Sequence, residues 1–309
     1  MPGPMDEPAA RAFLHGRFGA SAQITVMRPG EWSAAYGVRT AAADLVARFS
    51  AYDEDFEKDA YAARYASAAL PIPPILETGA AGDGYYAVAP RMPGVHIDTL
   101  DGASLRRVLP SLLAALDAMR AVNVFAGAGY GGWRADGSTW YPTWHEYLLG
   151  VAEGRATRGS PGWRELLRYS PTHTATFEEG FARIQELVEL CPEDRHLIHE
   201  DLMNFNILVD GDRVSAMLDW GSSIYGDFLY DFAKLVFYTP WRPDWRTIDF
   251  AVEARVHYEA LGVTVPHFDE RLRCYCLREG ISGMAYSAFR ERWEQVDRKA
   301  RRVLEIARA

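Results

Sequence analysis

Two patterns of hydrophobic and polar positions divide the chain near residue 95. Before that point, short apolar runs alternate with polar residues and are separated by turn-forming residues, which predicts strands. These runs are QITVM (23–27), YGVRT (36–40), ADLVARFS (43–50) and GYYAVAP (84–90). Beyond it, leucine and alanine recur every three or four residues, as in LRRVLPSLLAALDAMRAV (105–122). That spacing predicts helices as far as the C-terminus, apart from residues 206–219.

Two interruptions refine this picture. A helical run over residues 55–69 follows the early strands, and prolines at 71, 73 and 74 end it because they lack backbone donors and keep their neighbours extended. The glycine-rich segment 126–140 is predicted to be a loop. The chain is therefore expected to be an α+β protein with two lobes. They are a small antiparallel-sheet lobe over residues 1–92, a linker over 93–98, and a larger, mostly helical lobe over 99–309.

The segment HEDLMNFN (199–206) places a histidine, an aspartate and an asparagine, His199, Asp201 and Asn206, at fixed offsets between apolar residues. Such residues are either ordinary turn and cap residues or the catalytic loop of a kinase, in which an aspartate follows a histidine by two and an asparagine follows five later. The residues that follow favour the second interpretation, because ILV and AML form two short strands that lead to Asp219.

The turn between these strands decides where the polar residues lie. A turn spanning residues 210–215 would put Val209 opposite Ala216 and Asn206 next to Asp219. A tight two-residue turn at Asp210 and Gly211 would break this alignment. If Asn206 and Asp219 are aligned in this way, they would offer Mg²⁺ one amide oxygen and one carboxylate, the hard oxygen ligands that the ion prefers.

From His199 through LDWGSSIYGDFLYDFAKL, the chain resembles the aminoglycoside phosphotransferase family of small-molecule kinases, relatives of the protein kinases. YASAALPIP (65–73), residues 191–220 and PW (240–241) resemble the members that act on hygromycin B. The resemblance implies a protein-kinase-like fold and transfer of phosphate from ATP, with Mg²⁺, to a hydroxyl of a cationic aminoglycoside. Such a reaction confers resistance. Asp201 would be the catalytic base, and Asn206 and Asp219 the metal ligands.

The resemblance also assigns residues in the smaller lobe. Arg48 stands where the family commonly has a phosphate-binding lysine, and Asp59 matches the acid that would hold it by an ion pair. In AVAPRMPG, adenine would bond to the carbonyl of Pro90 and the amide of Met92. GEWSAA (30–35) occupies the place of the phosphate-covering loop but has a single glycine. Alternatively, Arg48 is an exposed arginine on a strand, and the apolar stretch AVAPRMPG is an ordinary edge strand.

Aromatic residues after the metal aspartate are candidates for the acceptor site. Tyr238, Trp241 and Trp245 could present flat faces to sugar C–H groups and ammonium groups, or could be core aromatics. The resemblance favours Tyr238 and Trp241 as the substrate-binding pair. His199 is expected to be structural, as are Asp227 and Asp231 at the start of a helix.

The net charge and the cysteine content indicate which kinds of binding partner the chain can have. With 42 acidic and 33 basic residues the net charge is −9, which disfavours nucleic acid and tolerates a cationic substrate. The three cysteines lack zinc-site spacing, and no apolar run is long enough to span a membrane. A monomeric cytoplasmic protein without a membrane partner is expected. A kinase of another hydroxylated compound (a macrolide, an amino alcohol or a sugar), a silent nucleotide-binding relative, and GTP as donor remain open.

Overall fold

The computed structural model of the chain describes residues 5–27, 30, 32–124, 127–153, 162–168 and 170–309. It divides into two compact units. Unit 1 comprises Met1–Thr99, Arg134–Asp136 and Asn204–Ser222, and unit 2 comprises Leu100–Trp133, Gly137–Met203 and Ser223–Ala309. The first boundary lies next to the expected linker at 93–98. Segment 204–222, which the sequence interpretation assigned to the second lobe, lies in unit 1.

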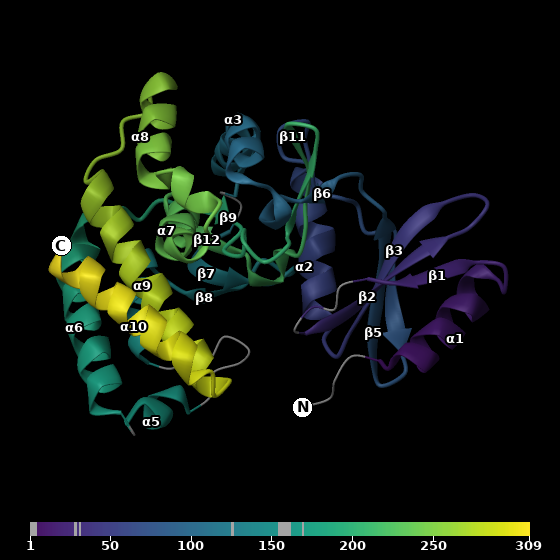
Figure 1. Ribbon diagram of the computed structural model, residues 1–309, viewed down its shortest axis with the longest axis horizontal. Coiled ribbons are helices and arrows are strands. Elements are labelled where there is room, and N and C mark those ends of the chain that lie inside the picture. The colour runs from purple at the N-terminus through teal and green to yellow at the C-terminus, as the bar shows by residue number, and fades with distance from the viewer. Residues whose placement is uncertain (1–4, 28–29, 31, 125–126, 154–161, 169) are drawn as a thin grey trace. The chain divides into compact units, whose positions relative to one another are not determined.

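Unit 1 is built on an antiparallel sheet in the order β1-β2-β3-β5-β4 (Figure 1). Its strands are β1 (Gln23–Val26), β2 (Ser33–Arg39), β3 (Asp44–Ser50), β4 (Glu77–Ala81) and β5 (Gly84–Pro90). Helix α1 (Glu7–Phe18) packs on this sheet, and its Leu14 shares a core cluster with Val38 and Phe49. The sequence interpretation missed α1. Its signal is local, since the Asp6 side chain caps the helix by accepting the Ala9 amide.

Two further elements of unit 1 matter for function. Helix α2 (Glu54–Ala62), followed by a 3-10 turn at Ala63–Tyr65, is shorter than the predicted helix over 55–69. A second antiparallel sheet, in the order β11-β10-β6, joins β6 (Val95–His96) to the hairpin of β10 (Ile207–Asp210) and β11 (Arg213–Met217). This sheet brings residues from the linker region against the hairpin that follows the HEDLMNFN segment.

Unit 2 contains a sheet that the sequence interpretation did not predict. Its order is β8-β7-β12-β9, with β7 (Tyr130–Trp133), β8 (Thr139–Tyr141), β9 (His196–Ile198) and β12 (Ile224–Gly226). Strands β7 and β8 occupy the segment expected to be a loop. Gly132 explains why glycine is needed there, because a Cβ atom at this position would lie 2.8 Å from the Trp140 ring. Close packing of an aromatic ring, and not loop mobility, accounts for this glycine.

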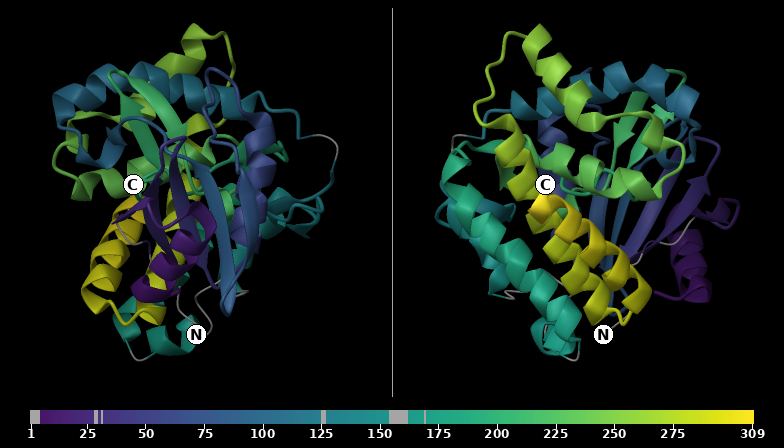
Figure 2. Two further views of the ribbon diagram at one scale, coloured as in Figure 1. Left: turned by 90° about the vertical axis from the view of Figure 1, so that its right-hand side faces the viewer. Right: turned by 60° about the vertical axis from the view of Figure 1, so that its left-hand side comes forward.

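The remainder of unit 2 is helical, as predicted. The helices are α3 (Gly102–Arg120), α4 (Trp144–Leu149), α5 (Trp163–Arg168), α6 (Pro171–Leu187), α7 (Tyr230–Tyr238), α8 (Phe250–Ala260), α9 (Phe268–Phe289) and α10 (Trp293–Arg308). Helix α9 is the central one, and α6, α7 and α10 pack against it (Figure 2). Its cysteines, Cys274 and Cys276, are buried free thiols, as is Cys191. No helix in the described ranges is long and apolar enough to cross a bilayer.

Candidate active site

Arg48 and Asp59 form the expected ion pair within unit 1. Arg48 lies on β3 and Asp59 on α2, and the Arg48 guanidinium donates to Asp59 Oδ2. The other carboxylate oxygen, Oδ1, accepts the Trp220 backbone N–H at 2.7 Å. The Asp59 side chain is only 6% exposed, so both of its bonds are shielded from water. Asp59 therefore connects the arginine on the sheet to the chain directly after Asp219.

Helix α2 makes two more contacts to the same segment. The Lys58 ammonium is buried and donates to the Gly221 carbonyl oxygen at 2.7 Å. A Cβ atom on Gly221 would lie 2.7 Å from Asp55 Oδ1 and 3.3 Å from Asp219 Oδ1, so both carboxylates flank this glycine. The sequence interpretation missed Lys58 and Asp55. The available signal was their spacing, because Asp55 precedes Lys58 by three residues and Asp59 by four, which places both beside it on the helix surface.

The hairpin turn differs from the prediction. Asp210 pairs with Arg213, so the turn is a tight one at Gly211 and Asp212, and Val209 faces Val214 instead of Ala216. Gly211 adopts φ = 60°, the left-handed conformation that such a turn requires. The expected turn over 210–215 is therefore wrong.

A bulge between Leu208 and Val209 shifts the register by one residue. Beyond it Leu208 faces Ala216, and the Asn206 carbonyl oxygen accepts the Leu218 N–H at 2.7 Å. Asn206 is thus opposite Leu218, the residue directly before its predicted partner, Asp219. Asp219 itself adopts a left-handed backbone conformation, with φ = 61°. The bulge largely compensates for the tight turn and keeps both residues at the open end of the hairpin.

The segment that leads into the hairpin is also fixed within unit 1. Phe205 adopts φ = 65°, and its N–H donates to Asp98 Oδ2 at 3.0 Å. Its ring meets His96 edge to face at 5.5 Å between centroids. The Asn206 side chain is 7% exposed. Its position is consequently set by the neighbouring linker residues as well as by the hairpin.

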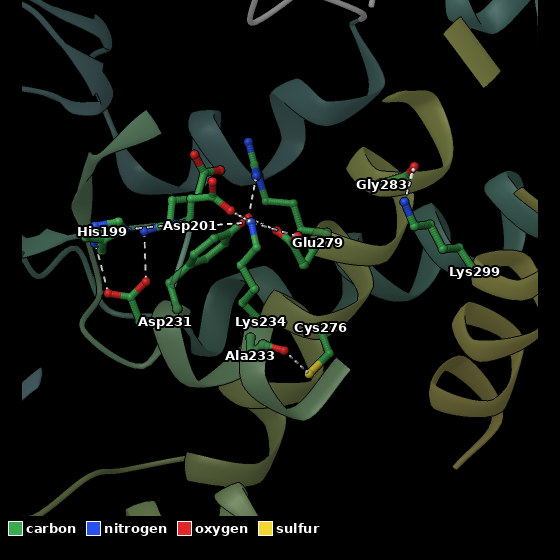
Figure 3. A network of polar contacts seen from close by, with 12 residues as sticks. His199, Asp201, Asp231, Ala233, Lys234, Cys276, Glu279, Gly283 and Lys299 are labelled. Carbon is green, nitrogen blue, oxygen red and sulfur yellow. Dashed lines mark hydrogen bonds and ion pairs between the residues drawn. The ribbon is translucent and has the colours of Figure 1, made fainter. Parts of the chain in front are cut away.

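In unit 2, the catalytic-loop residues follow strand β9. His199 is fully buried, and its Nδ1 atom accepts the Asp201 N–H at 3.2 Å, in accordance with the structural role expected for it. Asp231, in the first turn of α7, accepts the N–H groups of His199 and Glu200, each at 2.9 Å (Figure 3). Burial raises the pKa of Asp231 to about 6 although these bonds favour its charged form. Asp231 is structural, as expected, and the structure it supports is the catalytic loop.

Asp201 lies beside a buried cation. The Lys234 ammonium is 3.5 Å from Asp201 Oδ1 and 3.5 Å from Glu279 Oε1 (Figure 3). The Asp201 side chain remains 22% exposed, so a small molecule can reach it. Neither Lys234 nor Glu279 was recognised in the sequence, where a lysine in a helix is most often a surface residue.

The proposed acceptor aromatics lie at the end of α7. Tyr238 is one helical turn after Lys234, and its ring meets that of Trp241 at 5.4 Å and 69°. Arg298 lies over the Trp241 ring at 5.8 Å and the Lys299 ammonium over the Tyr238 ring at 5.7 Å. One face of each ring is thus covered by a cation of the chain itself. Trp245 is 2% exposed and belongs to the core.

Pro90 and Met92, the residues predicted to bind adenine, lie at the end of β5 and two residues beyond it. Pro90 ends β5 opposite Leu45, and the Arg91 N–H donates to the Asp44 carbonyl oxygen at 3.0 Å, which closes the ladder with β3. Pro90 and Met92 are both half-buried. The phosphate-covering segment at 30–35 includes Glu31, which is outside the described residues.

Comparison with known proteins defines the family. Residues 25–264 match the model of the phosphotransferase enzyme family. The chain belongs to this family. It is also 30% identical over 277 residues to the hygromycin-B 4-O-kinase of Escherichia coli, covering 89% of this chain and 77% of that protein.

Solved phosphotransferase structures share its fold. A thermostable mutant of aminoglycoside phosphotransferase APH(4)-Ia, in ternary complex with AMP-PNP and hygromycin B, matches with a TM-score of 0.86 and 27% identity, over 97% of this chain and 98% of that one. The GDP complex of aminoglycoside 2'-phosphotransferase-IIIa matches with a TM-score of 0.70 and 13% identity, over 98% and 99%. The predicted protein-kinase-like α+β fold is confirmed.

The residues predicted to form the site fall into two groups. Unit 1 contains Arg48, Asp59, Pro90, Met92, Asn206 and Asp219, and unit 2 contains Asp201, Tyr238 and Trp241. No group of three His, Cys, Asp or Glu side chains suited to a metal occurs among the described residues. The carboxylates of Asp55 and Asp219 both flank Gly221, and Asn206 directly precedes the β10–β11 hairpin. Carboxylate and amide oxygens are suitable for Mg²⁺, which takes few protein oxygens and completes its shell with substrate phosphates and water.

Proposed function

We propose that the chain transfers the γ-phosphoryl group of ATP to a hydroxyl of an aminoglycoside of the hygromycin B kind and so confers resistance. The observation that carries this proposal is the accessible Asp201 carboxylate on a loop that His199 and Asp231 hold rigid. Family membership and the similarity to the E. coli kinase give the reaction class and the acceptor class.

Each group of residues has a separate task in this reaction. Asp201 accepts the proton of the acceptor hydroxyl as that oxygen attacks the γ-phosphorus in line. Arg48, oriented by Asp59, donates to phosphate oxygens through two N–H groups at once. The Pro90 carbonyl and Met92 amide bond to adenine. Asn206 and Asp219 would hold Mg²⁺, which neutralises charge on the transferring group when bound.

The surroundings of Tyr238 and Trp241 bear on which acceptors fit. Because Arg298 and Lys299 already cover one face of these rings, an ammonium group of the acceptor has only the other faces to bind. The same observation favours a second candidate class, hydroxylated compounds of low charge such as a sugar. We further propose that the protein is monomeric and cytoplasmic, where ATP is available.

The direct test is an acceptor screen. Purified protein is incubated with Mg²⁺, either ATP or GTP, and a panel of aminoglycosides and neutral sugars, and products are detected by the mass of one added phosphoryl group. Phosphorylated hygromycin B with ATP supports the proposal. Turnover of a sugar alone would move the assignment to the second class, and the Asp201→Asn variant is the negative control in every reaction.

A further inference from the structure

Lys234 is held by three partners within unit 2. Its ammonium lies 3.5 Å from both Asp201 Oδ1 and Glu279 Oε1, and donates to the Glu200 carbonyl oxygen at 2.5 Å. The Lys234 side chain is 14% exposed and that of Glu279 is 7% exposed. Such a buried cation needs several partners to offset its desolvation, and this one has them.

The other two partners of Lys234 are themselves held by contacts within unit 2. Glu279 lies on the central helix α9 and receives the Tyr230 hydroxyl at 3.5 Å, and Tyr230 in turn accepts Arg278 at 2.5 Å. The Glu200 backbone is held by Asp231. These contacts fix the position of the ammonium independently of Asp201.

The Asp201 carboxylate, in turn, needs a contact that fixes its orientation. The bond from its N–H to His199 fixes its backbone, but this bond does not set the rotation of the carboxylate about its own side-chain bonds. The fixed Lys234 ammonium, 3.5 Å from Oδ1, attracts the carboxylate itself and so favours one orientation of it. The contact is on Oδ1, on a side chain that solvent still reaches.

We propose that Lys234 is a positioning residue for the reaction: anchored by Glu279 and the Glu200 backbone, it holds the Asp201 carboxylate in the orientation that receives the acceptor proton. The inference rests on the proposed function, in which Asp201 is the base. Since a displacement of about 1 Å at a reacting group can cost about 100-fold in rate, the loss of this contact should appear in kcat.

The first test replaces Lys234 by methionine, which keeps the unbranched stem and removes the charge. We expect kcat to fall about 10- to 100-fold. The KM for ATP should stay within about twofold, because the nucleotide residues are in unit 1. Lys234→Arg, which keeps the charge, should retain more activity than Lys234→Met. The control is Arg302→Met, which also removes a cation, here from a partly buried arginine on α10 that bonds to Glu305, and it should keep kcat within about twofold.

Lys234 could instead serve only to neutralise Glu279, and its loss could then unfold the protein. The double variant Lys234→Met/Glu279→Gln removes both charges and should restore the melting temperature. It should still have the low kcat of Lys234→Met. Parent-like kcat in this folded double variant would overturn the proposal.

The decisive measurement is a double-mutant cycle with Asp201→Asn, read as single-turnover rates. If Lys234 acts through Asp201, Lys234→Met should lower the rate of the Asp201→Asn enzyme by less than about twofold. Equal losses in both backgrounds would mean that Lys234 acts independently of Asp201, and the proposal would be wrong. Parent enzyme that phosphorylates no acceptor would instead contradict the proposed function, so the two failures are distinguishable.

Discussion

At the scale of single residues, Asp59 has a role beyond the one that its position in the sequence suggested. Its two oxygens accept hydrogen bonds from Arg48 and from the Trp220 N–H, so the proposed phosphate-binding arginine and the segment after Asp219 share one buried carboxylate. A carboxylate with two such bonds fixes both partners relative to each other within unit 1.

Arg48→Ala should therefore impair the use of ATP specifically. Loss of charge-assisted bonds worth about 1.5–3 kcal/mol should lower kcat/KM for ATP about 10- to 100-fold, and Arg48→Lys should keep part of it. Steady-state kinetics with ATP varied provide the measurement. Arg39→Ala, at an exposed arginine of the same sheet, is the matched control. Unchanged ATP kinetics in Arg48→Ala would place this arginine outside the site.

Glu200 should make stability depend on pH. Burial raises its pKa from 4.5 to about 7 despite the nearby Lys234 ammonium. The folded state therefore keeps a proton that the unfolded state loses, so the contribution of Glu200 to stability is largest below about pH 4.5 and is lost as the pH rises to about 7. Glu200→Gln removes the titration, and should stabilise the protein by on the order of 2–3 kcal/mol above pH 7 and by much less at pH 5.

Melting temperatures of the parent and Glu200→Gln at pH 5, 6, 7 and 8 test this expectation. The gap between the two proteins should widen over that range and level off above about pH 7. A constant gap would show that Glu200 does not titrate there.

At the scale of elements, the β10–β11 hairpin has the two proposed metal ligands, Asn206 and Asp219, at its open end. Asn206→Ala and Asp219→Ala should each raise the Mg²⁺ concentration for half-maximal rate about 10- to 100-fold. Asp210→Ala, at the exposed turn of the same hairpin, should leave it unchanged. The measurement is the reaction rate at a series of Mg²⁺ concentrations. If both variants show the Mg²⁺ dependence of the parent, Asn206 and Asp219 are not the metal ligands.

The hairpin also shows what a single sequence predicts. Alternation of apolar and polar residues located β3 and β5 nearly to the residue, and the resemblance to the family led to the ion pair of Arg48 and Asp59. The bulge was not predictable, because nothing in its own residues marks it and β10 also pairs with β6, more than a hundred residues earlier. Lys234 was missed for the same reason: only the packing of α7 against α9 brings it to Glu279.

At the scale of the whole molecule, the division of residues between units predicts that the two substrates can be perturbed separately. Trp241→Ala should raise the KM for the acceptor by the equivalent of about 1–2 kcal/mol, since ring surface for the sugar is lost, and leave the KM for ATP unchanged. Trp293→Ala, at a partly exposed tryptophan on α10, is the control. A parallel rise in both KM values would show that Trp241 supports the fold rather than the acceptor.

The measurement that tests the central claim most directly is the turnover of Asp201→Asn with hygromycin B and MgATP. Asparagine keeps the shape and removes the proton acceptor, so kcat should fall by roughly 10²- to 10⁴-fold. ATP affinity measured by calorimetry should be unchanged, because the assigned nucleotide residues are in unit 1. A parent enzyme that phosphorylates hygromycin B, together with an Asp201→Asn enzyme of near-normal kcat, would contradict the mechanism.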